Sequence, residues 1–315
     1  MVWDQLGRIE TALRDAVRTD TPVVAEPAGH LVAAGGKRFR PLLVVLAAHF
    51  GDPAGRHVEP AAVVVELTHL ATLYHDDVMD EAAVRRGAPS ANSRWTNSVA
   101  ILTGDFLFAR ASHITADLGP DAVRLLSRTF ERLVTGQIRE TTPAPAGTEP
   151  VAHYLGVLGD KTGSLMVTSA QFGAEFGGAD PALVAPLKEY GEAIGIAFQL
   201  SDDLLDIASE SSESGKTPGT DLREGVHTLP VLYALSSTDP AEARLRELLS
   251  SGPLVDDADH AEALDLLRRS PAMGQARMIV REYADRAAAI AAALPDVPAR
   301  RALTGLADYV VARSA

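Results

Sequence analysis

Two short acidic clusters, each with the pattern Asp-Asp-x-x-Asp, are the residues of this sequence best suited to chemistry. They consist of Asp76, Asp77 and Asp80 in the first copy and Asp202, Asp203 and Asp206 in the second. Each cluster ends an apolar run with helical periodicity, and residues four apart on a helix share a face. Because like charges at that spacing repel, both clusters are predicted to bind a cation.

The chemistry of the donors narrows the choice of cation. Neither cluster contains Cys or His between its first and last Asp, and hard oxygen ligands favour Mg²⁺ or Mn²⁺ over zinc. Mg²⁺ commonly uses one or two carboxylates and completes its shell with water and substrate phosphate. Basic residues follow each cluster, Arg85 and Arg86 in one case and Lys216 in the other, and these can hold the phosphate. The pattern therefore predicts a diphosphate site with bridging metals, the alternative being two solvated helix ends.

Three further features could contribute positive charge or hydrogen bonds. Gly35–Pro41 places Lys37, Arg38 and Arg40 before an apolar helix, whose N-terminus favours anions. Lys161-Thr162-Gly163-Ser164 combines a cation, hydroxyls and a small residue at a predicted helix start. His69 lies seven residues before Asp76, on the same helical face. Taken alone, a solvated turn or a core histidine explains each of them equally well.

Composition limits the classes of protein to which this chain can belong. It has 315 residues and a formal charge of −13, with 46% hydrophobic and 23% charged residues. Such a chain can bury a large core, and its acidity argues against non-specific nucleic-acid binding. The absence of cysteine excludes disulfides, thiolate metal sites and a cysteine nucleophile. A cytoplasmic location fits, and we expect no signal peptide and no transmembrane segment, with at most peripheral membrane contact.

The elements that must position these residues are predicted to be helices in one all-α domain spanning residues 1–315. Apolar residues recur at spacings of three and four, and no alternating strand is evident. Breaks are predicted where Gly, Pro, Ser and Asp gather: Thr21–Gly29, Gly51–Gly55, Thr142–Pro150, Gly177–Pro181, Ser209–Pro218 and Ser251–Asp257. Three stripes stand out: Val63, Leu67, Leu70 and Tyr74; Leu125, Phe130, Leu133 and Val134; and Ala193, Ile196, Ala197, Leu200 and Leu204. Arg268-Arg269 and Arg300-Arg301 are interpreted as solvated helix faces.

Between about Gly35 and Tyr233 the sequence resembles the trans-prenyltransferases, also called polyprenyl diphosphate synthases. The resemblance is carried, in the order of the family, by Gly-Gly-Lys-Arg-Phe-Arg-Pro, His-Asp-Asp-Val-Met-Asp with Arg-Arg-Gly, Gly104-Asp105-Phe106-Leu107, Lys161-Thr162-Gly163, Phe198–Asp203 and Gly215–Leu222. It implies an isoprenoid-synthase-type bundle of about a dozen helices around a deep central cavity, usually homodimeric. The implied reaction is the 1′-4 condensation of isopentenyl diphosphate with an allylic diphosphate. About three Mg²⁺ ions would assist in each active site.

The same resemblance implies roles for individual residues. The six aspartates and Lys161 would be catalytic. Mg²⁺ would be bound by Asp76, Asp80 and Asp202, with Asp77, Asp203 and Asp206 in support. The allylic diphosphate would be held by Arg85, Lys161, Thr162, Gln199 and Lys216. Isopentenyl diphosphate would be held by Lys37, Arg40, His69 and Arg86.

One departure and one specificity feature qualify the resemblance. Family members often carry Lys in Glu-Gly-Lys-x-Thr, but this chain has Val226 there, followed by His227. One cation on the allylic diphosphate is therefore missing. Short-chain members place aromatic rings just before the first cluster, where this chain has Ala71 and Thr72. The open path predicts an all-trans product of C30–C50, with Phe106 and Phe108 as candidates for the floor.

Three alternatives remain from the sequence. A C20 geranylgeranyl diphosphate synthase would result if a bulky side chain closed the cavity early. A class I terpene cyclase is disfavoured, because its second metal motif is typically based on Asn, Ser and Glu. A non-catalytic prenyl-binding or regulatory subunit should have lost at least one aspartate cluster, and both are intact here.

Overall fold

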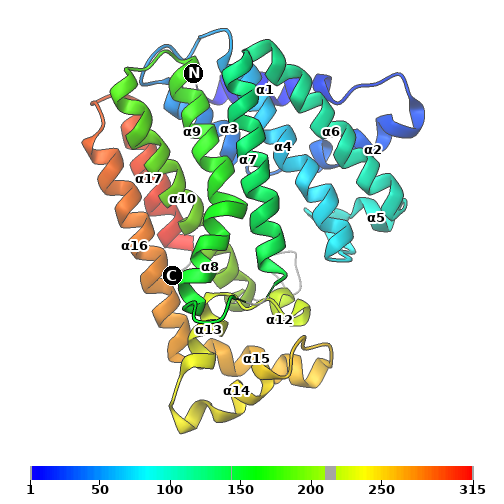
Figure 1. Cartoon of the computed structure of the whole chain (residues 1–315), viewed down its shortest axis with the longest axis vertical. Coiled ribbons are helices and arrows are strands. Elements are labelled where there is room, and N and C mark those ends of the chain that lie inside the picture. Colours follow the sequence, from blue (N-terminus) through cyan, green and yellow to red (C-terminus); the bar gives the residue numbers. More distant parts are fainter. Residues whose placement is uncertain (1, 143, 210–217, 314–315) are drawn as a thin grey trace. The chain divides into compact units, whose positions relative to one another are not determined.

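The computed structural model describes residues 2–142, 144–209 and 218–313, and most of them are α-helical (Figure 1). The predicted all-α class is confirmed. In this described part the only strands are β1 (Val84–Arg85) and β2 (Ala88–Pro89), which have two residues each and pair as an antiparallel hairpin. Of the described helices, none combines the length and the apolar character needed to cross a bilayer.

Contacts along the chain group into two compact units, each assembled from three segments. The first comprises Met1–Glu131, Leu165–Gly191 and Ala293–Ala302. The second comprises Arg132–Ser164, Glu192–Ala292 and Leu303–Ala315. Both units draw on early and late parts of the sequence, so no single cut along the chain would separate them. The predicted single domain of residues 1–315 stays a prediction.

The first unit contains the helices that precede and carry the first acidic cluster. They are α1 (Val2–Ala16), α2 (Pro22–Ala33), α3 (Phe39–Ala48), α4 (Val58–Met79), α5 (Ala91–Arg94), α6 (Asn97–Leu118) and most of α9 (Ser164–Phe176). Within this unit α4 packs against α1, α3 and α6 (Figure 1). Helices α7 (Pro120–Glu140), α10 (Pro181–Ala208) and α17 (Pro298–Arg313) contribute residues to both units.

The second unit contains the helices around the second acidic cluster. They are α8 (Pro150–Leu158), the π-helical turn η1 (Gly159–Gly163), α12 (Thr220–Glu224), α13 (Leu229–Ser236), the 3₁₀ turn η2 (Pro240–Glu242), α14 (Ala243–Ser250), α15 (Asp257–Arg269) and most of α16 (Pro271–Ala293). Within it α14 packs against both α13 and α15 (Figure 1).

Helix α4 forms the centre of the first unit because its apolar residues cover nearly its whole circumference. The predicted stripe of Val63, Leu67, Leu70 and Tyr74 is buried, as are the intervening valines. A helix that is apolar all round is buried all round, which agrees with neighbours on several sides. This burial fixes the end of α4, where the first cluster lies.

The predicted break at Thr21–Gly29 is wrong, because α2 runs through it. Pro22 occupies the first turn, where a missing N–H has no cost, and Pro27 lies inside the helix. The Tyr74 hydroxyl donates to the Pro27 carbonyl and accepts from Leu31 N–H at 3.2 Å. This buried hydroxyl joins α2 to α4, and its burial raises the pKa of Tyr74 to about 12. Tertiary contacts thus keep a helix that the local sequence disfavours.

Helix α7 buries a stripe that shares only Leu133 with the predicted one. Its buried residues include Ala122, Leu126, Thr129 and Leu133, while Val134 is exposed. Because Leu125 and Leu126 are neighbours, hydrophobicity alone does not decide which face of this helix is buried. In α10 the predicted stripe of Ala193, Ile196, Ala197, Leu200 and Leu204 is buried and therefore confirmed.

Replacing Gly173 by Ala is expected to destabilise the protein by about 1–3 kcal/mol through overpacking. A Cβ on Gly173 in α9 would lie 2.2 Å from the Val44 carbonyl oxygen of α3 and 2.7 Å from Ala47 Cβ. Gly274→Ala in α16 is the matched control: its Cβ meets nothing within 4 Å, so better helix propensity should stabilise by about 0.5–1 kcal/mol. Urea unfolding of the two variants checks the contrast. Equal changes in the free energy of unfolding would contradict it.

Candidate active site

The first acidic cluster occupies the C-terminal end of α4. Asp76 lies in the last turn, Asp80 caps the helix, and the Asp80 N–H donates to the Asp76 carbonyl at 2.8 Å. The predicted helical spacing is thus confirmed. The C-terminus of a helix carries partial negative charge, so carboxylates there are destabilising unless positive charge offsets them.

Asp77 and Asp80 already have one positive neighbour in Arg85. Asp77 is fully buried, and its Oδ1 accepts from Arg85 Nε at 2.5 Å. Arg85 Nη2 lies 3.8 Å from Asp80 Oδ2. Burial raises the pKa of Asp77 while Arg85 acts to lower it. Asp77 therefore orders the arginine, and Asp76 and Asp80 are the more exposed members of the cluster.

Arg85 and Arg86, in the hairpin β1–β2, bind different partners. The hairpin turn has positive φ at Arg86 (54°) and Gly87 (75°), as a type I′ turn requires. Arg86 Nη1 donates to the carbonyl oxygens of Leu31, at 3.2 Å, and Gly35. Gly36 has a φ of 143°, which favours glycine, and a Cβ there would lie 2.8 Å from Arg86 Cζ and displace the guanidinium.

The residues predicted to hold isopentenyl diphosphate lie in the first unit with these arginines. Helix α3 begins directly after Arg38, which places Lys37 and Arg40 on either side of the helix start. Partial burial and then the charges of Arg40 and Arg86 hold the pKa of His69 well below its usual value. A neutral imidazole thus lies within the field of several guanidinium groups. Such a concentration of positive charge suits an anion.

The second acidic cluster lies in the last turns of α10, and its middle member is buried. Asp203 Oδ2 accepts from the Tyr154 hydroxyl of α8, and Oδ1 accepts from Gln199 Nε2 at 3.0 Å. Thr162 of η1 donates to Gln199 Oε1 at 3.2 Å. Burial raises the pKa of Asp203 to about 7. The structure thereby joins two predicted allylic-site residues, Thr162 and Gln199, to the cluster.

The outer aspartates of this cluster contact other segments. Asp202 Oδ1 accepts from Arg313 Nη2 of α17, and the guanidinium stacks on the Phe198 ring at 4.7 Å. Asp206 accepts from the backbone N–H groups of Thr220 and Asp221, at 3.3 and 3.2 Å, and so caps α12. Asp202 is therefore ion-paired with α17, whereas Asp206 holds the start of α12.

Lys161 lies in η1 between α8 and α9, so the predicted helix start is instead a π-helical turn within a longer run of helix. Such turns are frequent at functional sites. A Cβ on Gly136 of α7 would lie 2.5 Å from the Lys161 backbone nitrogen, which brings α7 close to this turn. The Lys161 ammonium pairs with Glu140. Lys216 lies outside the described residues.

Several contacts of the candidate site had no signal in the sequence. Tyr154 and Arg313 reach the second cluster from helices remote in the chain, and their roles depend on the fold. Arg268, interpreted as part of a solvated face, donates to the carbonyl oxygens of Ile207 at 2.7 Å and Ser209 at 2.8 Å. It therefore neutralises the C-terminal end of α10, a favourable position for a cation.

The donor set fits Mg²⁺ with substrate oxygens as further ligands. Within the described ranges no group of three or more Asp, Glu, His or Cys side chains lies close enough to hold a metal alone. Mg²⁺ often has only one or two protein carboxylates, the rest of its shell being water and phosphate. Asp76 and Asp80 provide carboxylate oxygens of this kind within the first unit, and Asp202 does so within the second.

A family model described as Polyprenyl synthetase matches residues 21–267. The chain belongs to the polyprenyl synthetase family. The nonaprenyl diphosphate synthase of Mycobacterium tuberculosis is 52% identical to it over 309 residues, which cover 98% of this chain and 92% of that one. It is therefore a prenyltransferase of the polyprenyl diphosphate synthase type.

Solved structures of this family are similar along the whole chain. A geranylgeranyl pyrophosphate synthase from Corynebacterium glutamicum, complexed with calcium and isoprenyl diphosphate, is 47% identical with a TM-score of 0.87, covering 99% of this chain and 96% of that one. A decaprenyl diphosphate synthase from Rhodobacter capsulatus is 35% identical with a TM-score of 0.90, covering 100% and 97%. The predicted family and helical fold are confirmed.

Proposed function

We propose that this polyprenyl synthetase condenses isopentenyl diphosphate with an allylic diphosphate, in a 1′-4 trans reaction that requires Mg²⁺ and releases diphosphate. The observation that carries the proposal is the environment of the two clusters. In each, the second aspartate is buried and bonded to a protein side chain, Asp77 to Arg85 and Asp203 to Tyr154. The first aspartate of each pair is more exposed. Such a pair combines a buried, fixed carboxylate with a second one that lies nearer the surface, where metal and substrate would bind.

The residues then act on the two substrates in different ways. Asp76, Asp80 and Asp202 would hold Mg²⁺, which would supply positive charge to offset the negative charge that develops on the allylic diphosphate as its C–O bond breaks. Arg85, Lys161, Thr162, Gln199 and Lys216 bind the oxygens of that diphosphate. Lys37, Arg40, His69 and Arg86 bind isopentenyl diphosphate. No protein nucleophile is required, because the double bond of isopentenyl diphosphate attacks the allylic cation, and the new cation then loses a proton to the released diphosphate.

The product is proposed to be an all-trans chain of C30–C50. Ala71 and Thr72 are small and lie about one helical turn, roughly 5.4 Å, before Asp76. The similarity to the Mycobacterium tuberculosis nonaprenyl enzyme favours a long product, whereas the Corynebacterium glutamicum structure keeps C20 as the second candidate. Phe108, one candidate for the floor, stacks on Phe130 with ring centroids 4.2 Å apart, and Phe106 lies near Arg110.

We further propose that the enzyme is a cytoplasmic homodimer. Helix α6 of the first unit exposes two neighbouring apolar residues, Ile101 and Leu102, the latter 65% exposed. Two apolar side chains exposed next to each other are what a surface covered by a second copy of the chain would present. Sedimentation of the purified protein tests the dimer, and a monomer at all concentrations would contradict it.

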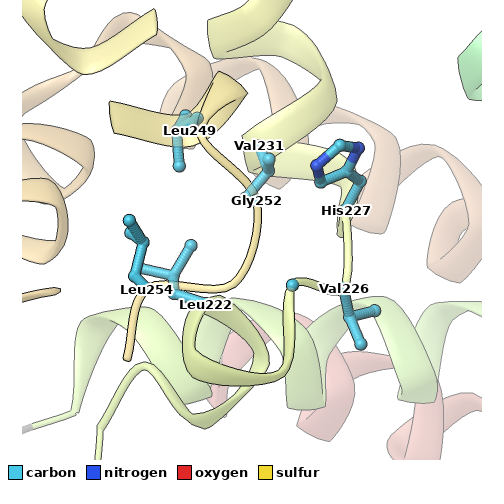
Figure 2. A pocket seen from close by; sticks show the side chains of 8 residues that line it. Leu222, Val226, His227, Val231, Leu249, Gly252 and Leu254 are labelled. Atoms are coloured by element: carbon cyan, nitrogen blue, oxygen red, sulfur yellow. The ribbon is translucent and has the colours of Figure 1, made fainter. Parts of the chain in front are cut away.

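Replacing Val226 by Lys is expected to lower the KM for the allylic substrate about 3- to 10-fold, since a charge-assisted contact adds about 1 kcal/mol. Val226 follows α12 and, with His227, borders a small pocket (Figure 2). Initial rates at varied allylic diphosphate measure the change. His227→Lys, one residue along, is the control. An unchanged KM for Val226→Lys would show that the missing family lysine has no counterpart function here.

The proposed function is tested by the metal dependence of isopentenyl incorporation. Protein freed of metal by chelation is incubated with labelled isopentenyl diphosphate and a C15 primer while Mg²⁺ is added stepwise. We expect no incorporation without metal and saturable incorporation with it. Binding of diphosphate with Mg²⁺ but no incorporation with any primer would contradict the proposal and favour a non-catalytic prenyl-binding subunit.

A further inference from the structure

Glu66 is a buried carboxylate in the middle of α4 that none of the roles above uses. Its side chain is 2% exposed and lies ten residues before Asp76, among apolar neighbours along the helix. A carboxylate is costly to bury unless cations or hydrogen-bond donors surround it. Its partners should therefore indicate why an acidic residue occupies this position.

Two arginines from different segments meet at one oxygen of Glu66. Arg38 Nη1 donates to Glu66 Oε1 at 2.8 Å. Arg86 Nη2 lies 3.9 Å from the same oxygen. Arg38 comes from the turn before α3 and Arg86 from the hairpin after α4. One buried carboxylate therefore links two basic segments that are far apart in the sequence.

Both arginines have a backbone conformation that favours glycine. Their φ angles are 48° for Arg38 and 54° for Arg86, and among the described residues Glu81 is the other non-glycine residue with positive φ. Such conformations persist where the surroundings hold them, and they concentrate at functional sites. Glu10 also holds Arg38, through bonds of 2.8 and 3.2 Å.

The strained turn controls the direction of the predicted diphosphate ligands. Arg38 directly follows Lys37 and lies two residues before Arg40, so its backbone angles set where these two side chains project. Arg86 is itself a member of the isopentenyl diphosphate set. We propose that Glu66 is a positioning residue for the isopentenyl diphosphate site, an inference that rests on the proposed function.

The negative charge of Glu66 would affect the binding of isopentenyl diphosphate in the opposite direction from its positioning role. A negative charge beside a cationic site weakens anion binding, so its removal would tighten the site if Glu66 acted only through its charge. Positioning predicts weaker binding instead. The Gln variant separates the two, because its amide oxygen can still accept from Arg38 whereas an Ala side chain cannot.

The test is a comparison of steady-state kinetics for wild type, Glu66→Ala and Glu66→Gln at varied isopentenyl diphosphate, with one allylic primer. We expect the KM for isopentenyl diphosphate to rise at least 10-fold in Glu66→Ala and by less in Glu66→Gln. The KM for the primer should change less than 2-fold. Glu59→Gln, on the same helix and paired with Arg8 at 2.7 Å, is the matched control with unchanged constants.

Results other than the expected ones would overturn the positioning role of Glu66, the proposed function or both. An unchanged or lower KM for isopentenyl diphosphate in a folded Glu66→Ala variant overturns the positioning role while leaving the proposed function intact. A wild-type protein without product overturns both. If thermal melting shows that Glu66→Ala does not fold, Glu66→Gln alone decides, since it keeps an oxygen for Arg38 but removes the negative charge that faces Arg86. A raised KM for isopentenyl diphosphate in that variant supports the inference, and an unchanged one overturns it.

Discussion

Replacing Asp76 or Asp202 by Asn is expected to lower the rate of prenyl transfer by about 10²–10³-fold or more, the effect of losing one group that stabilises transition-state charge. Asn keeps the size of the side chain but loses the charge that holds Mg²⁺. Asp76→Asn should also keep or slightly raise stability, by up to about 1 kcal/mol, because it removes a negative charge from the C-terminus of α4. Lost activity without lost stability would identify a functional carboxylate.

Initial rates and thermal melting of both variants measure these changes. Asp121→Asn is the control, since the Asp121 side chain is 94% exposed and, among the described residues, its only ion pair is with the nearby Arg124. Its rate should equal that of wild type. A folded Asp76→Asn or Asp202→Asn enzyme with a rate within 3-fold of wild type would show that the carboxylate is not a metal ligand.

Replacing Ala71 by Phe is expected to shorten the main product to C20 or less. Ala71 lies in α4 about one helical turn before Asp76, and a growing chain that passes this point would meet the ring. The product distribution, measured by mass spectrometry with a C15 primer, checks the prediction. Thr72→Phe is a second variant; it also removes the bond from the Thr72 hydroxyl to the His69 carbonyl at 2.8 Å, so thermal melting must show that it folds.

Leu73→Phe is the control for product length. Leu73 lies at the same level of α4 but about 200° around the helix from Ala71, so an added ring there points elsewhere. Its products should match those of wild type. If Ala71→Phe is folded and still makes C30 or longer chains, the growing chain does not run along this face of α4.

Local patterns predicted what depends on local spacing. The two Asp-Asp-x-x-Asp clusters, the stripe of α4 and the stripe of α10 follow from residues three and four apart, and the structure has them on helices. The sequence does not decide between two possible buried faces of a helix, or between a helix and a break where a proline occurs. Adjacent leucines left the phase of α7 open, and Pro27 indicated a break in α2 that a bond from Tyr74 overrides.

The partners of the site residues could not be predicted, because they come from remote segments. Nothing near Asp202 indicates that Arg313, 111 residues away, would pair with it. The same holds for Tyr154 and Asp203. Glu66 is different: it is the single acidic residue in the apolar run 61–74, and an isolated charge in a buried helix is a signal that sequence analysis can use.

The most direct test of the account is the mass of the products that the wild-type protein makes from isopentenyl diphosphate and a C15 or C20 primer with Mg²⁺. We expect a ladder of products that ends at C30–C50. A ladder that stops at C20 would keep the prenyltransferase and contradict the open path at Ala71 and Thr72. No product with either primer, despite bound Mg²⁺ and diphosphate, would contradict the central claim that both aspartate clusters serve catalysis.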